Sequence, residues 1–174
     1  MFLDESGFML QPIRRRTWAP RGQTPIQKAW DRHDRLSVIS AITVSPQTRR
    51  LGLYFQIHHE NIRAPHIVEF LTGLHRHLRR KSIVVWDRYS VHRKATRELL
   101  DRQKSWFDFE FLPGYAPELN PVEFVWNHTK YAQLANYIPE DLIDLKIEVD
   151  LALETECNNQ TFLRSCFGFA RLRL

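Results

Sequence analysis

The N-terminal part of the chain shows the two-residue alternation of apolar and polar positions that is typical of β-strands. This pattern predicts three strands over residues 2–10, 36–44 and 51–57, and the turn formers Ser45, Pro46, Gln47 and Thr48 join the last two. We therefore expect a hairpin or meander at the start of the fold.

After residue 64 the apolar spacing changes to three and four residues, which indicates an amphipathic helix. The apolar positions of this helix follow Pro65 and are Ile67, Phe70, Leu71, Leu74 and Leu78. A continuous apolar run at 83–87 predicts a strand that is covered on both faces and central in a sheet. The remaining segments predict a helix at 92–103, a half-buried strand at 107–111, and helices at 121–136, 139–156 and 161–172.

This order of elements is of the mixed α/β type. A ribonuclease H-like fold matches it, with a mixed five-stranded sheet in the order 3-2-1-4-5 that is flanked by helices. No repeat, low-complexity tract or linker divides the chain, so we predict a single domain over residues 1–174. In such a fold the strand of Asp4 lies beside the strand that ends in Asp87.

Composition adds a soluble character and a modest positive charge. Of the 174 residues, 43% are hydrophobic and 12% aromatic, which is enough for one core, and the apolar runs are too short to cross a bilayer. Lys and Arg outnumber Asp and Glu by 25 to 20, which suits a polyanionic partner. The cations cluster at 14–16 and 76–81, although a solvated helix end or loop explains such clusters equally well.

The two cysteines and the start of the chain bear on the compartment. Cys157 and Cys166 have no CxxC spacing, so we expect a reducing environment and no zinc site. The chain begins Met-Phe-Leu-Asp, without a charged leader followed by an apolar segment. Cytoplasm is therefore the expected location.

A carboxylate at the end of the apolar strand is the first candidate for a functional site. Asp87 needs a cation or a hydrogen-bond donor, because an ionised acid beside apolar walls is unfavourable. Its partner could be a metal ion. The alternative is that Asp87 caps the following turn or pairs with Arg88 or Arg93.

A second acid lies early in the first predicted strand. Alternation puts Asp4 on one face of the strand with Phe2 and Ser6, while the neighbouring Glu5 points to the other face. Only one of these two acids can face a shared site. The alternative for Asp4 is an exposed acid near a chain terminus.

The third acid begins a predicted helix. Asn120, Pro121 and Glu123 occupy the N-cap, N1 and N3 positions, so helix capping is one explanation for Glu123. The same position would also give a metal ligand a rigid mount. Carboxylates that converge without His or Cys favour Mg²⁺ or Mn²⁺, and two such ions about 4 Å apart can activate the nucleophile and stabilise the leaving oxygen in phosphodiester chemistry.

Three ordered motifs make the family recognisable. The runs LDESGF at 3–8 and RRTWAPRGQTP at 15–25 resemble the opening of mariner-type bacterial insertion-sequence transposases. The run at 83–87, with His92 downstream, is similar to the strand that carries their second acid. FLPGYAPELNPVE at 111–123, with Trp126 and Lys130 behind it, looks like the segment with their third acid. The resemblance covers about residues 2–154.

This resemblance implies the catalytic domain of a DDE transposase, which cuts transposon ends and joins them to target DNA. Asp4, Asp87 and Glu123 would ligate two Mg²⁺ or Mn²⁺ ions, and water and then a DNA 3′-hydroxyl would be the nucleophiles. Lys130 shares the helix face of Glu123 and could touch a phosphate, as could Arg14, Arg15 and Arg16. The family is also compatible with a homodimer on DNA.

Two departures from the family pattern leave an alternative open. Arg88 stands where the family usually has Asn, and it could pair with Asp87 and weaken metal binding. The helix-turn-helix domains that precede the first acid in relatives are not expected here, so a separate subunit or segment could supply that reader. The alternative is a catalytically inactive, basic DNA-binding remnant of a mobile element. A general nuclease ranks last, because it does not account for the motif at 117–123.

Overall fold

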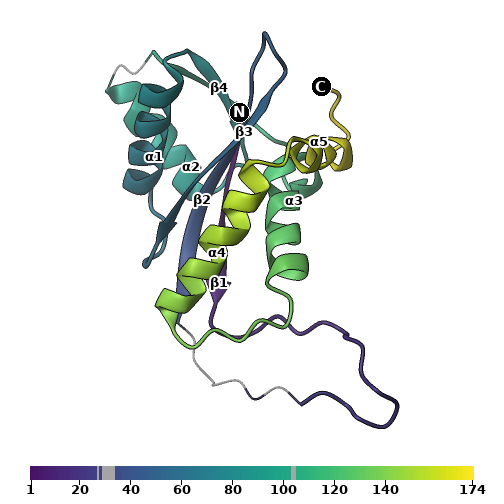
Figure 1. Ribbon diagram of the computed structural model, residues 1–174. Coiled ribbons are helices and arrows are strands. Elements are labelled where there is room, and N and C mark those ends of the chain that lie inside the picture. Colours follow the sequence, from purple (N-terminus) through teal and green to yellow (C-terminus); the bar gives the residue numbers. More distant parts are fainter. Residues whose placement is uncertain (27, 29–33, 103–104) are drawn as a thin grey trace.

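A computed structural model describes residues 1–26, 28, 34–102 and 105–174 (Figure 1). Its centre is a five-stranded sheet in the order β3-β2-β1-β4-β5, as predicted. The strands are β1 Phe2–Met9, β2 Arg35–Val44, β3 Leu51–His58, β4 Ser82–Trp86 and β5 Phe107–Phe111.

The pairing of β1 decides where the first two acids lie. β1 pairs antiparallel with β2 on one side and parallel with β4 on the other, where Phe2 lies opposite Val85. The carboxyl end of β4 therefore lies beside the first residues of β1. This register brings Asp4 and Asp87 to the same edge of the sheet, although they are far apart in sequence.

Helices cover both faces of the sheet (Figure 1). On one face lie α1 Ala64–Leu78 and α2 Ser90–Asp101, and on the other lie α3 Pro121–His128, α4 Leu142–Cys157 and α5 Gln160–Phe169. The sheet thus separates two apolar cores. Burial of apolar side chains in two such layers stabilises the fold by roughly 25 cal/mol for each Å² removed from water.

Strand β1 contributes side chains alternately to the two cores. Leu3 is completely buried in the core under α1 and α2. Phe2 and Phe8 point the opposite way, and their rings contact Phe167 of α5 and Trp126 of α3 at centroid distances of 5.6 and 6.1 Å. The predicted alternation is confirmed, so Asp4 faces α3 and Glu5 faces α2.

Strand β4 is less completely covered than its sequence predicts. It has neighbours on both sides, but Ile83 is 53% exposed. The exposed end lies at a surface cavity beside the α1–β4 connection, where no helix packs on Ile83. Val84 and Trp86 are fully buried and both point to the face of α1 and α2, whereas Ile83 and Val85 point to the other face and are not buried. The prediction of a central strand is therefore confirmed, and the prediction of cover on both faces is wrong.

The helices after the third acid also differ from the prediction. The predicted helix 121–136 ends earlier, because α3 passes at His128 into a π-helical turn, Thr129–Gln133. Helix α4 begins at Leu142 rather than 139, because the Asp141 carboxylate caps it by accepting hydrogen bonds from the backbone N–H groups of residues 143 and 144, both at 2.8 Å.

In the part of the chain that the structure describes, no helix is both long and apolar enough for a membrane span.

Candidate active site

Three carboxylates from three elements meet at the edge where β1 and β4 adjoin. Asp4 belongs to β1, Asp87 directly follows β4, and Glu123 lies in the first turn of α3. The charge of Glu123 raises the pKa of Asp4, and the charge of Asp87 raises the pKa of Glu123. The structure thus brings together the three acids that the sequence predicted as a set.

Asp4 is the most strongly perturbed acid of the three. Its Oδ2 accepts a hydrogen bond of 3.1 Å from the indole Nε1 of Trp126. Burial raises the pKa of Asp4 well above its usual value of 3.8, and the negative charges of Glu123 and Glu5 raise it further. The alternative of an ordinary exposed acid near a terminus does not describe this environment.

Glu123 is held by a capped helix but does not cap that helix itself. The Asn120 side chain accepts a hydrogen bond from the backbone N–H of Val122 and donates one to the backbone oxygen of Leu3, which ties α3 to β1. The backbone N–H of Asn120 donates to Pro117, so it is not available for a capping box with Glu123. The predicted N-cap is confirmed, and the Glu123 carboxylate is directed at the site.

The charge around Glu123 is only partly balanced. Burial raises its pKa, and Asp87 adds to the rise, while Lys130 and a side-chain hydrogen bond with Asp4 oppose it. Lys130 donates a hydrogen bond of 2.7 Å to the Ser6 hydroxyl and lies 5.1 Å above the centre of the Phe8 ring. Burial lowers the pKa of Lys130, whereas Glu123 and Asp4 raise it. Lys130 therefore lies near the acids and supplies positive charge to them.

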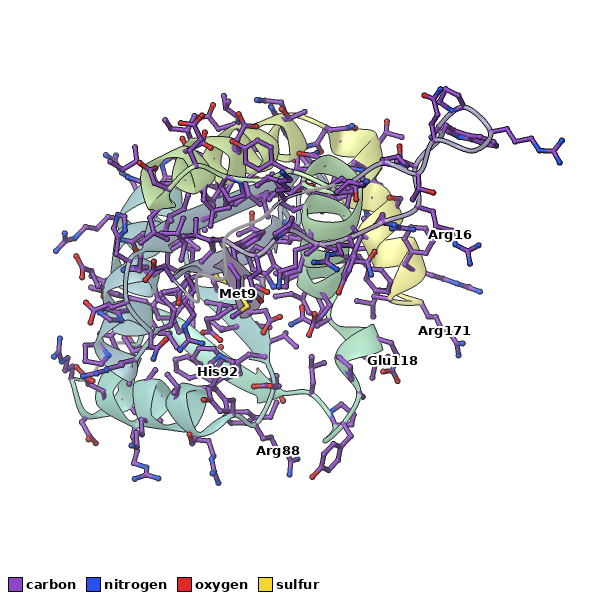
Figure 2. The ribbon with its side chains drawn as sticks, turned by 90° about the horizontal axis from the view of Figure 1, so that it is seen from below. Met9, Arg16, Arg88, His92, Glu118 and Arg171 are labelled. Atoms are coloured by element: carbon purple, nitrogen blue, oxygen red, sulfur yellow. The ribbon has the colours of Figure 1, made fainter. Side chains whose placement is uncertain are left out.

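Asp87 has a partner that the sequence did not suggest. Its Oδ1 accepts hydrogen bonds from the backbone N–H of Tyr89 at 2.8 Å and from Nδ1 of His92 at 2.6 Å. The contact with Tyr89 is the turn capping that had been an alternative. Among the described residues, neither Arg88 nor Arg93 forms an ion pair with Asp87, and Arg88 points outward in Figure 2.

His92 connects Asp87 to a fourth acid. Its Nε2 lies 2.9 Å from both carboxylate oxygens of Glu5, on the α2 side of the sheet. Burial lowers the pKa of His92. The hydrogen bonds and negative charges of Glu5 and, to a smaller extent, Asp87 have a larger effect and raise this pKa to about 9. The alternation of β1 had already directed Glu5 to this face, but only the packing of α2 brings His92 to it.

The donor chemistry of the three acids suits a hard divalent cation. Carboxylate oxygens are preferred by Mg²⁺ and Mn²⁺, and the raised pKa values of Asp4 and Glu123 reflect negative charge that the protein compensates only in part. As the side chains stand, no three His, Cys, Asp or Glu groups within the described ranges are gathered closely enough to hold a metal ion. One oxygen of Asp87 is engaged by His92 and Tyr89 in this arrangement.

The predicted DNA-binding arginines lie on the connection between β1 and β2. Arg14, Arg15 and Arg16 are all exposed, and Arg16 lies at the periphery of the molecule in Figure 2. Arg15 is anchored instead, because its backbone N–H donates to the Asn136 side chain at 2.8 Å and its guanidinium donates to the backbone oxygen of Tyr131 at 2.9 Å. Arg15 is thus tied to the residue that follows Lys130, and Lys130 itself acts on Glu123 and Asp4.

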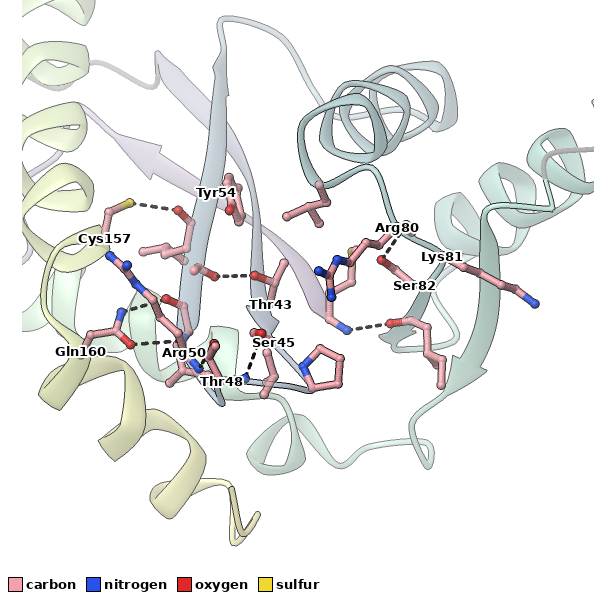
Figure 3. Close-up of a pocket in the computed structure, with 18 residues that line it drawn as sticks. Thr43, Ser45, Thr48, Arg50, Tyr54, Arg80, Lys81, Ser82, Cys157 and Gln160 are labelled. Carbon is pink, nitrogen blue, oxygen red and sulfur yellow. Dashed lines mark hydrogen bonds between the residues drawn. The ribbon is translucent and has the colours of Figure 1, made fainter.

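A surface cavity lies away from the three acids. This cavity of about 740 Å³ lies at the other end of β4, between the β2–β3 turn and the α1–β4 connection (Figure 3). Its cations include Arg50, Arg80 and Lys81, and none of the three predicted site acids lines it. This cavity is therefore separate from the candidate site.

The sheet order and the acidic edge together define a ribonuclease H-like fold with a carboxylate site. Residues 1–146 match the family model described as DDE superfamily endonuclease, and the chain belongs to this family. No curated protein matches the chain in a sequence comparison.

Solved structures of a mariner transposase share the fold. The Mos1 strand transfer complex matches with a TM-score of 0.67 and 17% identity, over 98% of this chain and 51% of that chain. The Mos1 paired-end complex with the left transposon end matches at 0.69 and 17%, over 98% and 52%. The Mos1 paired-end complex with Mn matches at 0.69 and 16%, over the same shares of 98% and 52%. The chain thus spans about half the length of the chains it matches.

Proposed function

We propose that this chain is a transposase catalytic domain that cleaves DNA strands and transfers them to target DNA, with Asp4, Asp87 and Glu123 as the ligands of two Mg²⁺ or Mn²⁺ ions. The observation that carries the proposal is the convergence of these acids, from three elements, into one cluster whose charge is only partly compensated. The Mos1 structures that share the fold include a strand transfer complex, a paired-end complex with the left transposon end, and paired-end complexes with Mn and Mg, and they support the same chemistry.

The protein side chains would act mainly by holding the acids in place. The Trp126 indole orients Asp4, and the capped first turn of α3 fixes Glu123. When bound, the divalent ions would activate the attacking hydroxyl and stabilise the leaving oxygen of the phosphodiester. Water would be the nucleophile in cleavage and a DNA 3′-hydroxyl in joining, so no covalent bond between protein and DNA is required.

The basic side chains supply the proposed contacts to DNA. Lys130 lies beside Glu123, where its ammonium group can meet a phosphate that approaches the acids. Arg14 and Arg16 are exposed and could bind the backbone further away, without reading sequence. Arg88 does not pair with Asp87 among the described residues, which removes one argument for an inactive remnant.

Strand joining tests the proposal directly. Pre-nicked DNA ends taken from the sequences that flank the gene are incubated with the chain, a plasmid target and Mn²⁺, and joined products are separated on a denaturing gel. We expect joining by the parent and none by Asp4→Asn, Asp87→Asn or Glu123→Gln. Asp108→Asn is the matched control. Asp108 is an exposed acid on β5, away from the three site acids in sequence, and it pairs with Lys81. Equal products from the parent and the three site variants would refute the proposed function.

A further inference from the structure

We propose that Glu5 and His92 are positioning residues that hold the Asp87 carboxylate in the orientation required for metal binding. The inference rests on the proposed function, because it assigns a role to residues around the proposed ligand Asp87. Neither residue is itself among the three proposed ligands. Together they form a chain of hydrogen bonds from Glu5 through His92 to Asp87.

The His92 ring is fixed in every direction that matters for Asp87. The side chain is 1% exposed, and its two ring nitrogens meet Asp87 at 2.6 Å and Glu5 at 2.9 Å. Trp86 stacks on the ring at a centroid distance of 4.8 Å and an angle of 8°, and the Tyr89 ring approaches edge-on at 6.1 Å. A ring that is bonded at both nitrogens and stacked on Trp86 cannot rotate without breaking a contact.

Asp87 itself has little other support. It follows the last residue of β4, and its side chain is 56% exposed. Besides the bond from His92, its carboxylate accepts a hydrogen bond from the backbone N–H of Tyr89, two residues along the same loop. A half-exposed carboxylate on a loop loses orientation easily, so the buried imidazole is the contact that ties it to the core of the domain.

Two neighbouring residues of β1 therefore contribute to the site in different ways. Asp4 faces α3 and enters the site directly, whereas Glu5 faces α2 and reaches Asp87 through His92. Side chains behind a metal ligand that fix its orientation commonly change metal affinity about 10- to 100-fold when removed. We expect an effect of this size, because one oxygen of Asp87 bonds directly to His92.

Metal affinity separates a positioning role from a purely structural one. Mn²⁺ binding is measured by electron paramagnetic resonance on the folded chain, together with metal-free thermal unfolding. His92→Ala and Glu5→Ala are expected to weaken Mn²⁺ binding about 10- to 100-fold. His92→Asn and Glu5→Gln each keep a hydrogen-bonding group at the substituted position. These two variants should fold and should bind Mn²⁺ more tightly than the corresponding alanine variants.

His128→Ala is the matched control. His128 also bonds a carboxylate, Glu156 at 2.9 Å, but on the opposite side of the sheet. This variant should lower the melting temperature and leave Mn²⁺ affinity unchanged. Suppose that Asp87→Asn loses Mn²⁺ affinity, but that every folded variant of His92 and Glu5 binds Mn²⁺ as the parent does. The positioning role is then wrong, and the proposed function stands. If the parent and Asp87→Asn bind Mn²⁺ equally weakly, both proposals fail.

Discussion

A buried acid of α4, Glu156, and the group of acids around Asp4 differ in their neighbours. Glu156 of α4 is 1% exposed and accepts hydrogen bonds from Nδ1 of His128 at 2.9 Å and from the Thr129 hydroxyl at 3.0 Å. Burial raises the pKa of Glu156, but His128 and Thr129 lower it. Around Asp4, by contrast, the nearby acids Glu123 and Glu5 add to the effect of burial.

The difference teaches how to distinguish a structural acid from a functional one. A raised pKa occurs in both places, so it does not identify a site by itself. The surroundings do, because the neighbours of Glu156 are hydrogen-bond donors, whereas Asp4, which accepts one bond from Trp126, also has the acids Glu123 and Glu5 nearby. Acids that repel one another are stabilised by a cation, and Lys130 and His92 supply part of that positive charge.

The largest effect should follow from removing a site acid. Asp4→Asn, Asp87→Asn and Glu123→Gln should each lower the rate of DNA cleavage by about three orders of magnitude or more, since a catalytic metal supplies several kcal/mol of transition-state stabilisation. Nicking of a supercoiled plasmid in Mn²⁺ measures this. Glu156→Gln should cleave at the parental rate, and a comparable loss in that variant would remove the distinction between the two groups.

The next largest effect should be on stability, at the structural acid. Glu156→Ala leaves a small cavity and removes the partner of His128 and Thr129, so we expect a loss of about 2–3 kcal/mol in the free energy of unfolding. Glu156→Gln keeps the shape and one acceptor and should lose about 1 kcal/mol or less. Urea unfolding at neutral pH measures both. A change in Mn²⁺ affinity in either variant would contradict a purely structural role.

A smaller effect on stability is expected at Asp4, where the substitution should stabilise the metal-free protein. Its pKa is higher in the folded protein than in the unfolded chain, so the folded state binds more protons. The resulting stability is fully present below the unfolded pKa and is lost as pH rises through the folded pKa. Asp4→Asn should therefore raise the metal-free melting temperature at pH 8 by about 2–4 °C, the shift that corresponds to roughly 1 kcal/mol in a domain of this size.

Thermal unfolding in EDTA from pH 4 to pH 8 checks this prediction. The difference between Asp4→Asn and the parent should grow with pH, and added Mg²⁺ should stabilise the parent more than the variant. Asp87→Asn is less suitable for this comparison, because it also alters the bonds to His92 and Tyr89. A parent that is more stable than Asp4→Asn at every pH without metal would show that the Asp4 charge is well compensated.

The smallest effect should come from a single arginine on the β1–β2 connection. Arg16 is exposed, so Arg16→Ala should weaken DNA binding several-fold at low salt, equally for all sequences, and reduce the salt dependence by about one phosphate contact. Fluorescence anisotropy over a salt series measures it. Arg15→Ala is a less specific variant, since Arg15 also holds the connection to Tyr131. An unchanged salt slope in Arg16→Ala would place the DNA elsewhere.

The sequence by itself determined most of the elements and the face on which each β1 residue lies. The alternation of Phe2, Asp4 and Ser6 depends only on the two-residue period of a strand, so it could be predicted without neighbours. The same holds for the Asn120 cap, which depends on residues adjacent in sequence. The order of elements predicted the sheet order, which is confirmed, and the family motifs joined the three acids into one catalytic set. The role of these acids remains a prediction to be tested with metal and DNA.

Only the tertiary structure decided which side chains meet. Glu5 and His92 are 87 positions apart, and their contact arises because β1 lies beside β4 and α2 packs on that face. The π-helical turn after α3, where Thr129 bonds to Glu156, and the exposure of Ile83 likewise depend on distant segments. Local periodicity reports the direction in which a side chain points, but its partner is set by the packing of elements that the period does not describe.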